Sequence, residues 1–306
     1  MTRRHVPPQL YFVTSAVFHY LGPSFAVLLF ARVAVLGVAW LRIASAALVF
    51  ALWRKPWRSV NGLDSATRRL LVGWGAVLAA MNCCFYEAIA RLPLGTVAAI
   101  EFLPVIVLAA VGVRTLRNAF ALALAVAGVY ELSHVQLTSQ PLGFAFAFAN
   151  AALFATYIVI AHRVARHPAV SGIDGLGAAM LIAAVAVTPV AGPQAAHVFS
   201  DPVALVAGVG VGICSSVIPY VADQLAMANL SRAAYSLMVS LLPAVATVIG
   251  IVVLTQLPTT AELAGVALVA GGVAVHRDMD EDAGALQSCH RKEYGRAIPG
   301  KWRERA

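Results

Sequence analysis

The run VAVLGVAWLRIASAALVFALW, from Val33 to Trp53, contains one charged residue, Arg42, and is followed at once by Arg54 and Lys55. A helix needs roughly 20 mostly apolar residues to cross the hydrocarbon core of a bilayer, so this run is long enough to span a membrane. It also lacks the alternation of polar and apolar residues that is typical of outer-membrane barrel strands. The stretch therefore predicts a transmembrane helix with one cation inside it.

The composition of the whole chain agrees with that interpretation. Of its 306 residues, 60% are hydrophobic and 12% are charged, whereas about 25% of the residues in a soluble globular protein are charged. A soluble fold of this size cannot bury so much apolar surface, because its exterior still has to be polar. An ordinary soluble enzyme is excluded, and a chain solvated largely by lipid is expected.

Similar apolar runs recur along the chain and predict an all-α polytopic membrane protein with ten transmembrane helices. The predicted spans are Leu10–Phe30, Val33–Trp53, Leu70–Ala90, Leu94–Val113, Asn118–Ser133, Leu142–Ala161, Leu176–Val190, Val203–Met227, Ala233–Leu254 and Ala261–His276. In the eighth span, small residues recur every four positions and form a face for close packing, within one chain or between two chains of a homodimer. They are Ala204, Gly208, Gly212 and Ser216.

The basic residues are distributed unevenly between the two sides that ten alternating spans define. Of the 22 Lys and Arg residues, 19 fall on one side, Arg32 and Arg91 fall on the other, and Arg42 lies within a span. Cytoplasmic loops carry such an excess, so both termini are expected in the cytoplasm of a bacterial inner-membrane protein. The net charge of +8 is then a signal of topology, and nucleic acid is not an expected partner.

Ten spans divide into two sets of five, and short likenesses in sequence link the sets. Residues 90–98 resemble residues 228–236, and Pro104 and Pro243 lie near the middle of the fourth and ninth spans. A second copy of a five-helix unit must enter the membrane upside down, which gives the inverted repeats common among secondary transporters. The predicted units are residues 1–138, residues 139–276 and a polar cytoplasmic tail, 277–306.

Several motifs, taken in order, resemble one family. Met81-Asn82-Cys83-Cys84-Phe85-Tyr86, Leu92-Pro93-Leu94-Gly95 and Ala99-Ile100-Glu101-Phe102 are similar to the third and fourth helices of the threonine/homoserine exporter branch of the drug/metabolite transporter superfamily (EamA-type). Leu41-Arg42, Tyr157-Ile158 and Pro219-Tyr220-x-x-Asp223 add matches. The resemblance implies two inverted five-helix repeats and export of small amino acids or related metabolites, driven by proton exchange. The chain departs from the family pattern at Leu242 and Thr255-Gln256, which leaves its second half with fewer carboxylates.

Ionisable side chains inside spans are costly, so they mark candidate functional sites. Arg42 and Glu101 both lie roughly 10–14 Å deep, from a helix rise of about 1.5 Å per residue. They could form a structural ion pair, or they could hold the carboxylate and the ammonium group of a zwitterionic substrate. Asp223 and Glu87, near the ends of their helices, are candidates for two gates, and interfacial solvation is the alternative. The predicted substrate or proton-coupling residues are Arg42, Glu101 and Asp223.

Polar and proline residues in the same spans complete the candidate site. The cavity-lining candidates are Asn82, Tyr86, Asn150, Tyr157 and Tyr220, and the helix-kinking candidates are Pro104, Pro219 and Pro243. Asn82 shares a helical face with Tyr86, and Asn150 shares one with Tyr157. These side chains could bond to a polar substrate or between helices.

The sequence predicts a secondary active transporter rather than an enzyme. It contains no GxxxxGK[ST] phosphate-binding loop and no HExxH or GxSxG motif. A single cation within the spans suits a zwitterion better than a nucleotide sugar. The expected partners are a small polar or zwitterionic metabolite, protons and the lipid bilayer, and no metal or cofactor is expected. The alternatives are a drug or other metabolite transporter of the same fold and, in a different class, a membrane scaffold or sensor that acts through residues 277–306.

Overall fold

The computed structural model describes residues 8–60, 62–112, 115–136, 140–165, 170, 172–229 and 241–275. Within these ranges the chain is helical and contains no strand. Six helices are long and apolar enough to cross a membrane, and further apolar helices are shorter. The protein is therefore a multi-pass membrane protein that is all-helical over these ranges, as its composition predicts.

Each predicted span overlaps a helix. The first five correspond to α1 (Pro8–Leu29), α2 (Val35–Arg54), α4 (Ser65–Ile89), α5 (Leu94–Gly112) and α6 (Leu116–Gln136), and a short helix, α3 (Trp57–Val60), follows α2. The others correspond to α7 (Pro141–Ala165), α8 (Gly172–Ala195) with the 3-10 turn η1 (Ala196–Ser200), α9 (Pro202–Gly212) with η2 (Ile213–Val217) and α10 (Ile218–Asn229), α12 (Leu242–Leu254) and α13 (Thr260–Val275).

Two of these helices differ clearly from their predicted spans, and the start of a third predicted span is not among the described residues. The seventh span is longer than predicted, because α8 continues through Pro189 and Pro193, which a membrane helix tolerates when neighbouring groups satisfy the freed carbonyls. The eighth span is not one regular helix, since the π-helical turn η2 separates α9 from α10. The predicted start of the ninth span, Ala233, lies outside the described residues.

Two ion pairs mark the two ends of the bundle. At one end, which we call the Arg32 end, Arg32 lies 3.5 Å from Asp201. At the other, the Arg54 end, Nε of Arg54 lies 2.8 Å from Oδ1 of Asp174. Arg32 and Asp201 lie between helices, whereas Arg54 ends α2 and Asp174 lies in the first turn of α8. In each pair, both residues fall on the side of the membrane that ten alternating spans assign to them in common.

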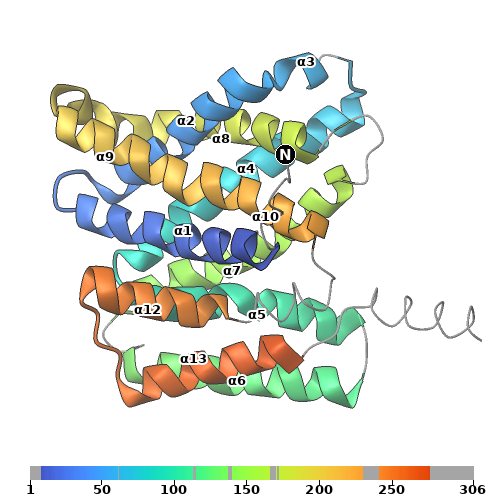
Figure 1. Ribbon diagram of the computed structural model, residues 1–306, viewed down its shortest axis with the longest axis vertical. Helices are drawn as coiled ribbons and strands as arrows, with labels where there is room; N and C mark the ends of the chain where they lie inside the picture. Colours follow the sequence, from blue (N-terminus) through green and yellow to red (C-terminus); the bar gives the residue numbers. More distant parts are fainter. Residues whose placement is uncertain are drawn as a thin grey trace, which may run out of the picture.

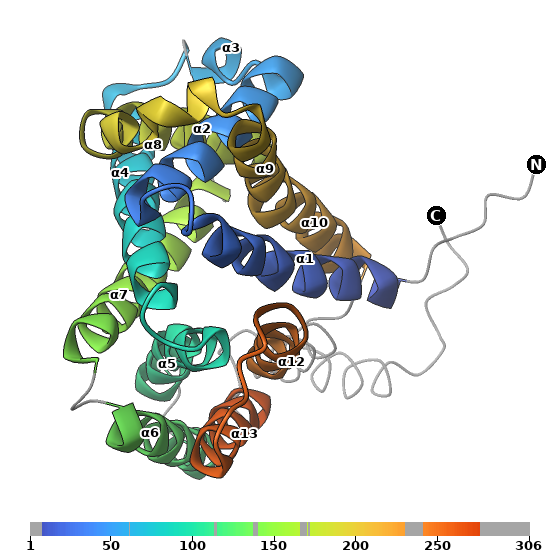
Figure 2. The ribbon, with the colours of Figure 1, turned by 90° about the vertical axis from the view of Figure 1, so that its left-hand side faces the viewer.

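The helices pack in pairs that join the two halves of the chain. α6 packs along α13, α5 along α12 and α2 along α8, while α4 packs on α7 and α1 on α10. Figure 1 shows α5, α6, α12 and α13 gathered in the lower part of the molecule, with the remaining helices above them. In Figure 2, α1 lies beside α9 and α10. Most pairings therefore connect a helix before residue 138 with one after it.

The small-residue face predicted in the eighth span packs within the chain, against α2. A Cβ atom added at Gly208 would lie 2.6 Å from Cδ1 of Leu41, and one added at Gly212 would lie 1.8 Å from Oγ of Ser45. Only glycine lets the two backbones approach so closely. This contact brings the middle of the eighth span against the middle of α2, where Arg42 lies.

Candidate functional site

Polar side chains from several helices are buried near the middle of the bundle. Helices are expected to be apolar at this depth, because a polar group facing lipid has no hydrogen-bond partner. The residues are Tyr20 of α1, Arg42 of α2, Tyr86 of α4, Glu101 of α5, Asn150 of α7, and Ser215 and Ser216 of η2. They include both of the charged residues that the sequence places deep in the membrane.

Arg42 is bonded to neutral groups of the π turn. Its residue surface is only 6% exposed. Its Nε donates to Oγ of Ser216 at 3.1 Å, and its Nη2 donates to the carbonyl oxygen of Ser215 at 3.2 Å. The guanidinium carbon also lies 5.5 Å from the centre of the Tyr86 ring. Because a guanidinium carries five N–H donors, these bonds leave donors for a further acceptor.

Glu101 is as buried as Arg42 but has a different partner. Its Oε1 accepts a hydrogen bond from Nδ2 of Asn150 at 3.1 Å. No ion pair joins these two described residues, so the direct pair that the sequence offered as one arrangement is not formed. Arg42 is instead hydrogen-bonded to neutral groups of η2, and Glu101 to a neutral amide of α7.

Four buried polar atoms near these charges have no hydrogen-bond partner in the described part of the chain. They are the hydroxyl groups of Tyr20, Tyr86 and Ser215, and Oδ1 of Asn150. An unpaired buried polar group costs about 1–3 kcal/mol, so such groups call for a ligand or a water molecule. The site offers a cation, a carboxylate and uncharged hydrogen-bonding groups, which together can bind a small polar molecule.

Comparisons with known proteins agree with the resemblance seen in the motifs. The sequence model of the EamA-like transporter family matches residues 141–276. The threonine/homoserine exporter RhtA of Escherichia coli strain K12 is 32% identical over 251 residues, which cover 79% of this chain and 81% of that protein. RhtA of Salmonella typhimurium is 31% identical over 243 residues, covering 77% of this chain and 79% of that protein.

The chain belongs to the EamA-like transporter family. A solved crystal structure also superposes with a TM-score of 0.58, covering 88% of this chain and 96% of that chain, and at 20% identity it shows a shared fold. The family predicted from the motifs is thereby confirmed, and the protein is a membrane transporter of the EamA type rather than an enzyme.

Some residues predicted to line the cavity of this EamA-family transporter have structural partners. Nδ2 of Asn82 donates to the carbonyl oxygen of Leu78 in its own helix at 2.8 Å. Tyr157 stacks on Phe154 with ring centres 6.1 Å apart, and half-buried Tyr220 packs against the apolar cluster of α2, α4 and α8. Among the predicted lining residues, Tyr86 lies against the guanidinium of Arg42 and Asn150 bonds to Glu101.

The structure describes the side chain of only one of the two predicted gate carboxylates. Glu87 forms an ion pair with Arg91, one turn further along the chain. Asp223 lies on α10, but its side chain is outside the described residues. The gate roles of both residues stay predictions.

The predicted kink prolines lie in three different settings. Pro104 is inside α5, and Pro219 is the second residue of α10, directly after the π turn. Pro243 lies in the first turn of α12, where a missing N–H is tolerated because the first turn has no acceptor for it. It therefore begins the described helix rather than interrupting its middle.

Sequence reasoning missed three members of the central group, Tyr20, Ser215 and Ser216. A serine in a span rich in Ala and Gly carries no signal of its own. The one available clue was Pro219, which lies four residues after Ser215 and removes the donor that would bond to its carbonyl.

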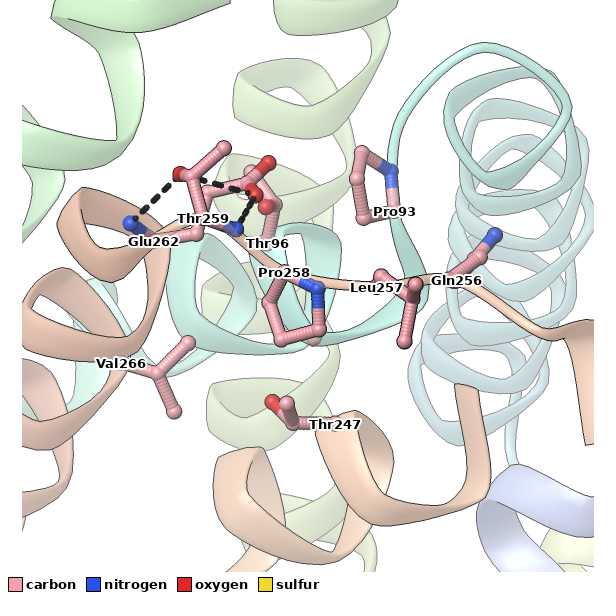
Figure 3. A pocket seen from close by; sticks show the side chains of 10 residues that line it. Pro93, Thr96, Thr247, Gln256, Leu257, Pro258, Thr259, Glu262 and Val266 are labelled. Carbon is pink, nitrogen blue, oxygen red and sulfur yellow. Dashed lines mark hydrogen bonds between the residues drawn. The ribbon is translucent and has the colours of Figure 1, made fainter. Parts of the chain in front are cut away.

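A second polar site, a pocket of about 280 Å³, lies between the first turn of α5, α12 and the start of α13. Figure 3 shows Thr96, Thr247, Gln256 and Glu262 among its lining residues. The carboxylate of Glu262 accepts bonds from the backbone N–H (2.7 Å) and hydroxyl (3.1 Å) of Thr259, which caps α13. Thr96 and Glu101 are five residues apart and point about 140° apart around α5. The pocket is therefore separate from the central site.

Proposed function

We propose that this protein is a secondary active exporter of small zwitterionic amino acids, such as threonine or homoserine. The observation that carries the proposal is the arrangement of Arg42 and Glu101, which are both buried and are hydrogen-bonded to separate neutral partners rather than to each other. A substrate carboxylate would bond to the guanidinium, beside the hydroxyls of Tyr86 and Ser215. Its ammonium group would bond to Glu101 and to the unpartnered Oδ1 of Asn150.

Charge balance supports this class of substrate. Two opposite charges at low dielectric constant are each costly to bury, and a zwitterion brings a counter-charge to both at once. A nucleotide sugar would bring several negative charges to one cation, and an uncharged solute would leave both groups without a counter-charge. The relatives named threonine/homoserine exporters support the same choice.

The proposed transport cycle is alternating access between two inverted repeats, residues 1–138 and 139–276. The helix pairs support this division. When the ten spans are numbered in order, span 2 packs on span 7, span 4 on span 9 and span 5 on span 10, so each of these spans packs on its equivalent in the other half. Span 3 packs on span 6, and the equivalent spans in the other half, span 8 and span 1, also pack on each other. A pattern of contacts that survives exchange of the two halves is expected of a duplicated unit, which places the substrate at the interface between halves.

Proton coupling is assigned to Glu101, with Asp223 as a second carboxylate on the same route. A protonated Glu101 no longer attracts an ammonium group, so protonation from the outside would favour release of the amino acid. In this proposal the protein lies in the bacterial inner membrane, and the Arg54 end faces the cytoplasm with both termini, as the excess of basic residues favours.

The test is counterflow in proteoliposomes against a panel of amino acids and other metabolites, with and without a pH gradient. L-threonine and L-homoserine are expected to exchange, whereas nucleotide sugars and lipophilic cations are not. Arg42→Gln should weaken substrate binding about 10- to 100-fold, because a charge-assisted hydrogen bond contributes about 1.5–3 kcal/mol. Arg32→Gln is the matched control, since Arg32 lies in an exposed ion pair.

Glu101→Gln tests the coupling separately. Efflux driven by a pH gradient should be lost. Unchanged pH-dependent flux in this variant would remove Glu101 as the proton carrier, and normal threonine exchange by Arg42→Gln would contradict the substrate assignment.

A further inference from the structure

One turn of the eighth span is wound differently from the helices on either side. In η2 (Ile213–Val217), the backbone N–H of Ile218 donates to the carbonyl oxygen of Ile213, five residues earlier. A π turn of this kind is rare and occurs frequently at functional sites. The turn packs against both α1 and α2, and it joins α9 to α10, which lie beside α1 in Figure 2.

A proline determines which carbonyl group of this turn is free. Pro219 has no backbone N–H, so it cannot donate to the carbonyl of Ser215, four residues earlier, as the residue at that position in a regular helix does. That carbonyl instead accepts from Nη2 of Arg42 at 3.2 Å, while Oγ of Ser216 accepts from Nε at 3.1 Å. The turn therefore supplies both acceptors that hold the guanidinium.

Neighbouring helices hold the turn tightly on two sides. A Cβ atom added at Gly22 of α1 would lie 2.1 Å from Oγ of Ser215, and one added at Gly212 would lie 1.8 Å from Oγ of Ser45 on α2. Closely packed surfaces do not deform continuously but shift between discrete arrangements. A change in the shape of this turn must therefore move α1, α2 or α10.

We propose that the carbonyl of Ser215 and the hydroxyl of Ser216 form a releasable latch for Arg42, which couples substrate binding to movement of α10. The inference rests on the proposed function, because it requires a substrate carboxylate at Arg42. A carboxylate makes stronger, charge-assisted bonds to a guanidinium than neutral oxygens do. The carboxylate first binds the remaining donors of Arg42 and, as the stronger acceptor, then draws the guanidinium away from the turn. The Ser215 carbonyl thereby loses its partner, and α10 is free to tilt against α9. Ser216 and Pro219 are positioning residues, since they act through Arg42.

Hydrogen–deuterium exchange on the purified full-length protein tests the release, with L-threonine and L-homoserine as probes. Adding either probe should make the backbone amides of residues 213–218 exchange roughly fivefold faster, because a released turn opens more often. Arg42→Gln should show the fast exchange without any probe. Slower or unchanged exchange at this turn, in a protein that binds and transports the probes, overturns the latch.

Pro219→Ala tests the same idea by restoring the missing N–H. The Ser215 carbonyl then has a donor within its own helix and competes less for Arg42. We expect the melting temperature to rise by about 2–4 °C while the maximal transport rate falls about tenfold. If Pro219 had only a structural role, the stabilised Pro219→Ala variant would transport as fast as the wild-type protein. Pro189→Ala in α8 is the matched control, because Pro189 is exposed at the helix surface and is expected to leave transport unchanged.

Ser216 provides a milder variant that keeps the proposal testable if Pro219→Ala does not fold. Ser216→Ala removes the acceptor for Nε of Arg42, so the maximal rate should fall with little change in KM, and Ser216→Thr, which keeps the hydroxyl, should restore it. Wild-type rates in Ser216→Ala would overturn the latch.

If the wild-type protein binds neither probe, the proposed function fails and the latch fails with it. If Arg42→Gln loses binding but Pro219→Ala and Ser216→Ala transport normally, only the latch fails.

Discussion

Helix α4 and the segment α9–η2–α10 hold the third place in the two five-helix sets, and they begin alike but differ in the middle. Each starts at an aspartate that caps the helix: Asp64 accepts bonds from the N–H groups of Ala66 and Thr67, and Asp201 from those of Val203 and Ala204. Beyond the cap, α4 runs unbroken to Ile89, whereas the other segment contains the π turn.

The difference lies in which groups each helix presents to the site. In α4 the backbone is satisfied internally, and even Nδ2 of Asn82 returns to the carbonyl of Leu78, so the helix contributes side chains such as Tyr86. In the other segment, Pro219 leaves a backbone carbonyl free for Arg42. We therefore call α4 the fixed wall of the site and the segment α9–η2–α10 its adjustable part.

The largest expected effect comes from forcing the adjustable segment away from α2. Gly212→Ala would place a methyl group 1.8 Å from Oγ of Ser45 and 2.8 Å from the carbonyl of Arg42, and overpacking of this kind costs about 1–3 kcal/mol. Thermal unfolding and transport should both suffer. Gly210→Ala, two residues earlier with no atom within 4 Å of the added group, should be neutral or slightly stabilising. Equal behaviour of the two variants would contradict the tight contact.

A smaller effect is expected when the fixed wall loses one polar atom. Tyr86→Phe removes a buried hydroxyl that has no hydrogen-bond partner in the described part of the chain, so the substrate-free protein should gain about 1 kcal/mol of stability, the lower end of the cost of such a group. Binding of L-threonine should weaken if that hydroxyl bonds to the substrate. Calorimetry with and without L-threonine separates these effects, and unchanged affinity would show that α4 contributes only the ring that lies against Arg42.

The smallest expected effect concerns the two caps, where the helices are alike. The hydroxyl of Thr67 holds the pKa of Asp64 below its usual 3.8, and the backbone N–H of Ala204 does the same for the pKa of Asp201. Because both values are lowered in the folded state, the caps stabilise the protein above pH 3.8 and lose this contribution as the pH falls through the folded pKa.

Melting temperatures measured between pH 3 and pH 7 check this prediction. Asp64→Ala and Asp201→Ala should each lower the melting temperature slightly and similarly at neutral pH, and should weaken the decline in acid. Asp→Asn at either position should keep most of the cap, since an amide oxygen also accepts these bonds. A large difference between the two positions would show that the two helix starts are not equivalent.

Arg42 and Glu101 could be predicted as site residues because a charge inside an apolar run is conspicuous and costly. Their partners could not be predicted. The sequence offered a direct ion pair as one arrangement, but a neutral amide on α7 and a π turn some 170 residues away in sequence meet these charges instead. The sequence around Ser215 and Pro219 does not show which donor, distant in the chain, will bond to the carbonyl of Ser215.

The sequence by itself determined the number and order of the apolar runs and the concentration of basic residues in alternate segments, because both follow from local composition and from the cost of placing charge in lipid. Its ordered motifs indicated the family. Only the tertiary structure decided that α2 packs on α8 and α9, that Asn82 bonds within its own helix, and that Arg42 is bonded to the π turn rather than to Glu101. These outcomes depend on which helix faces meet, and close packing among many small residues settles that only when the whole bundle has assembled.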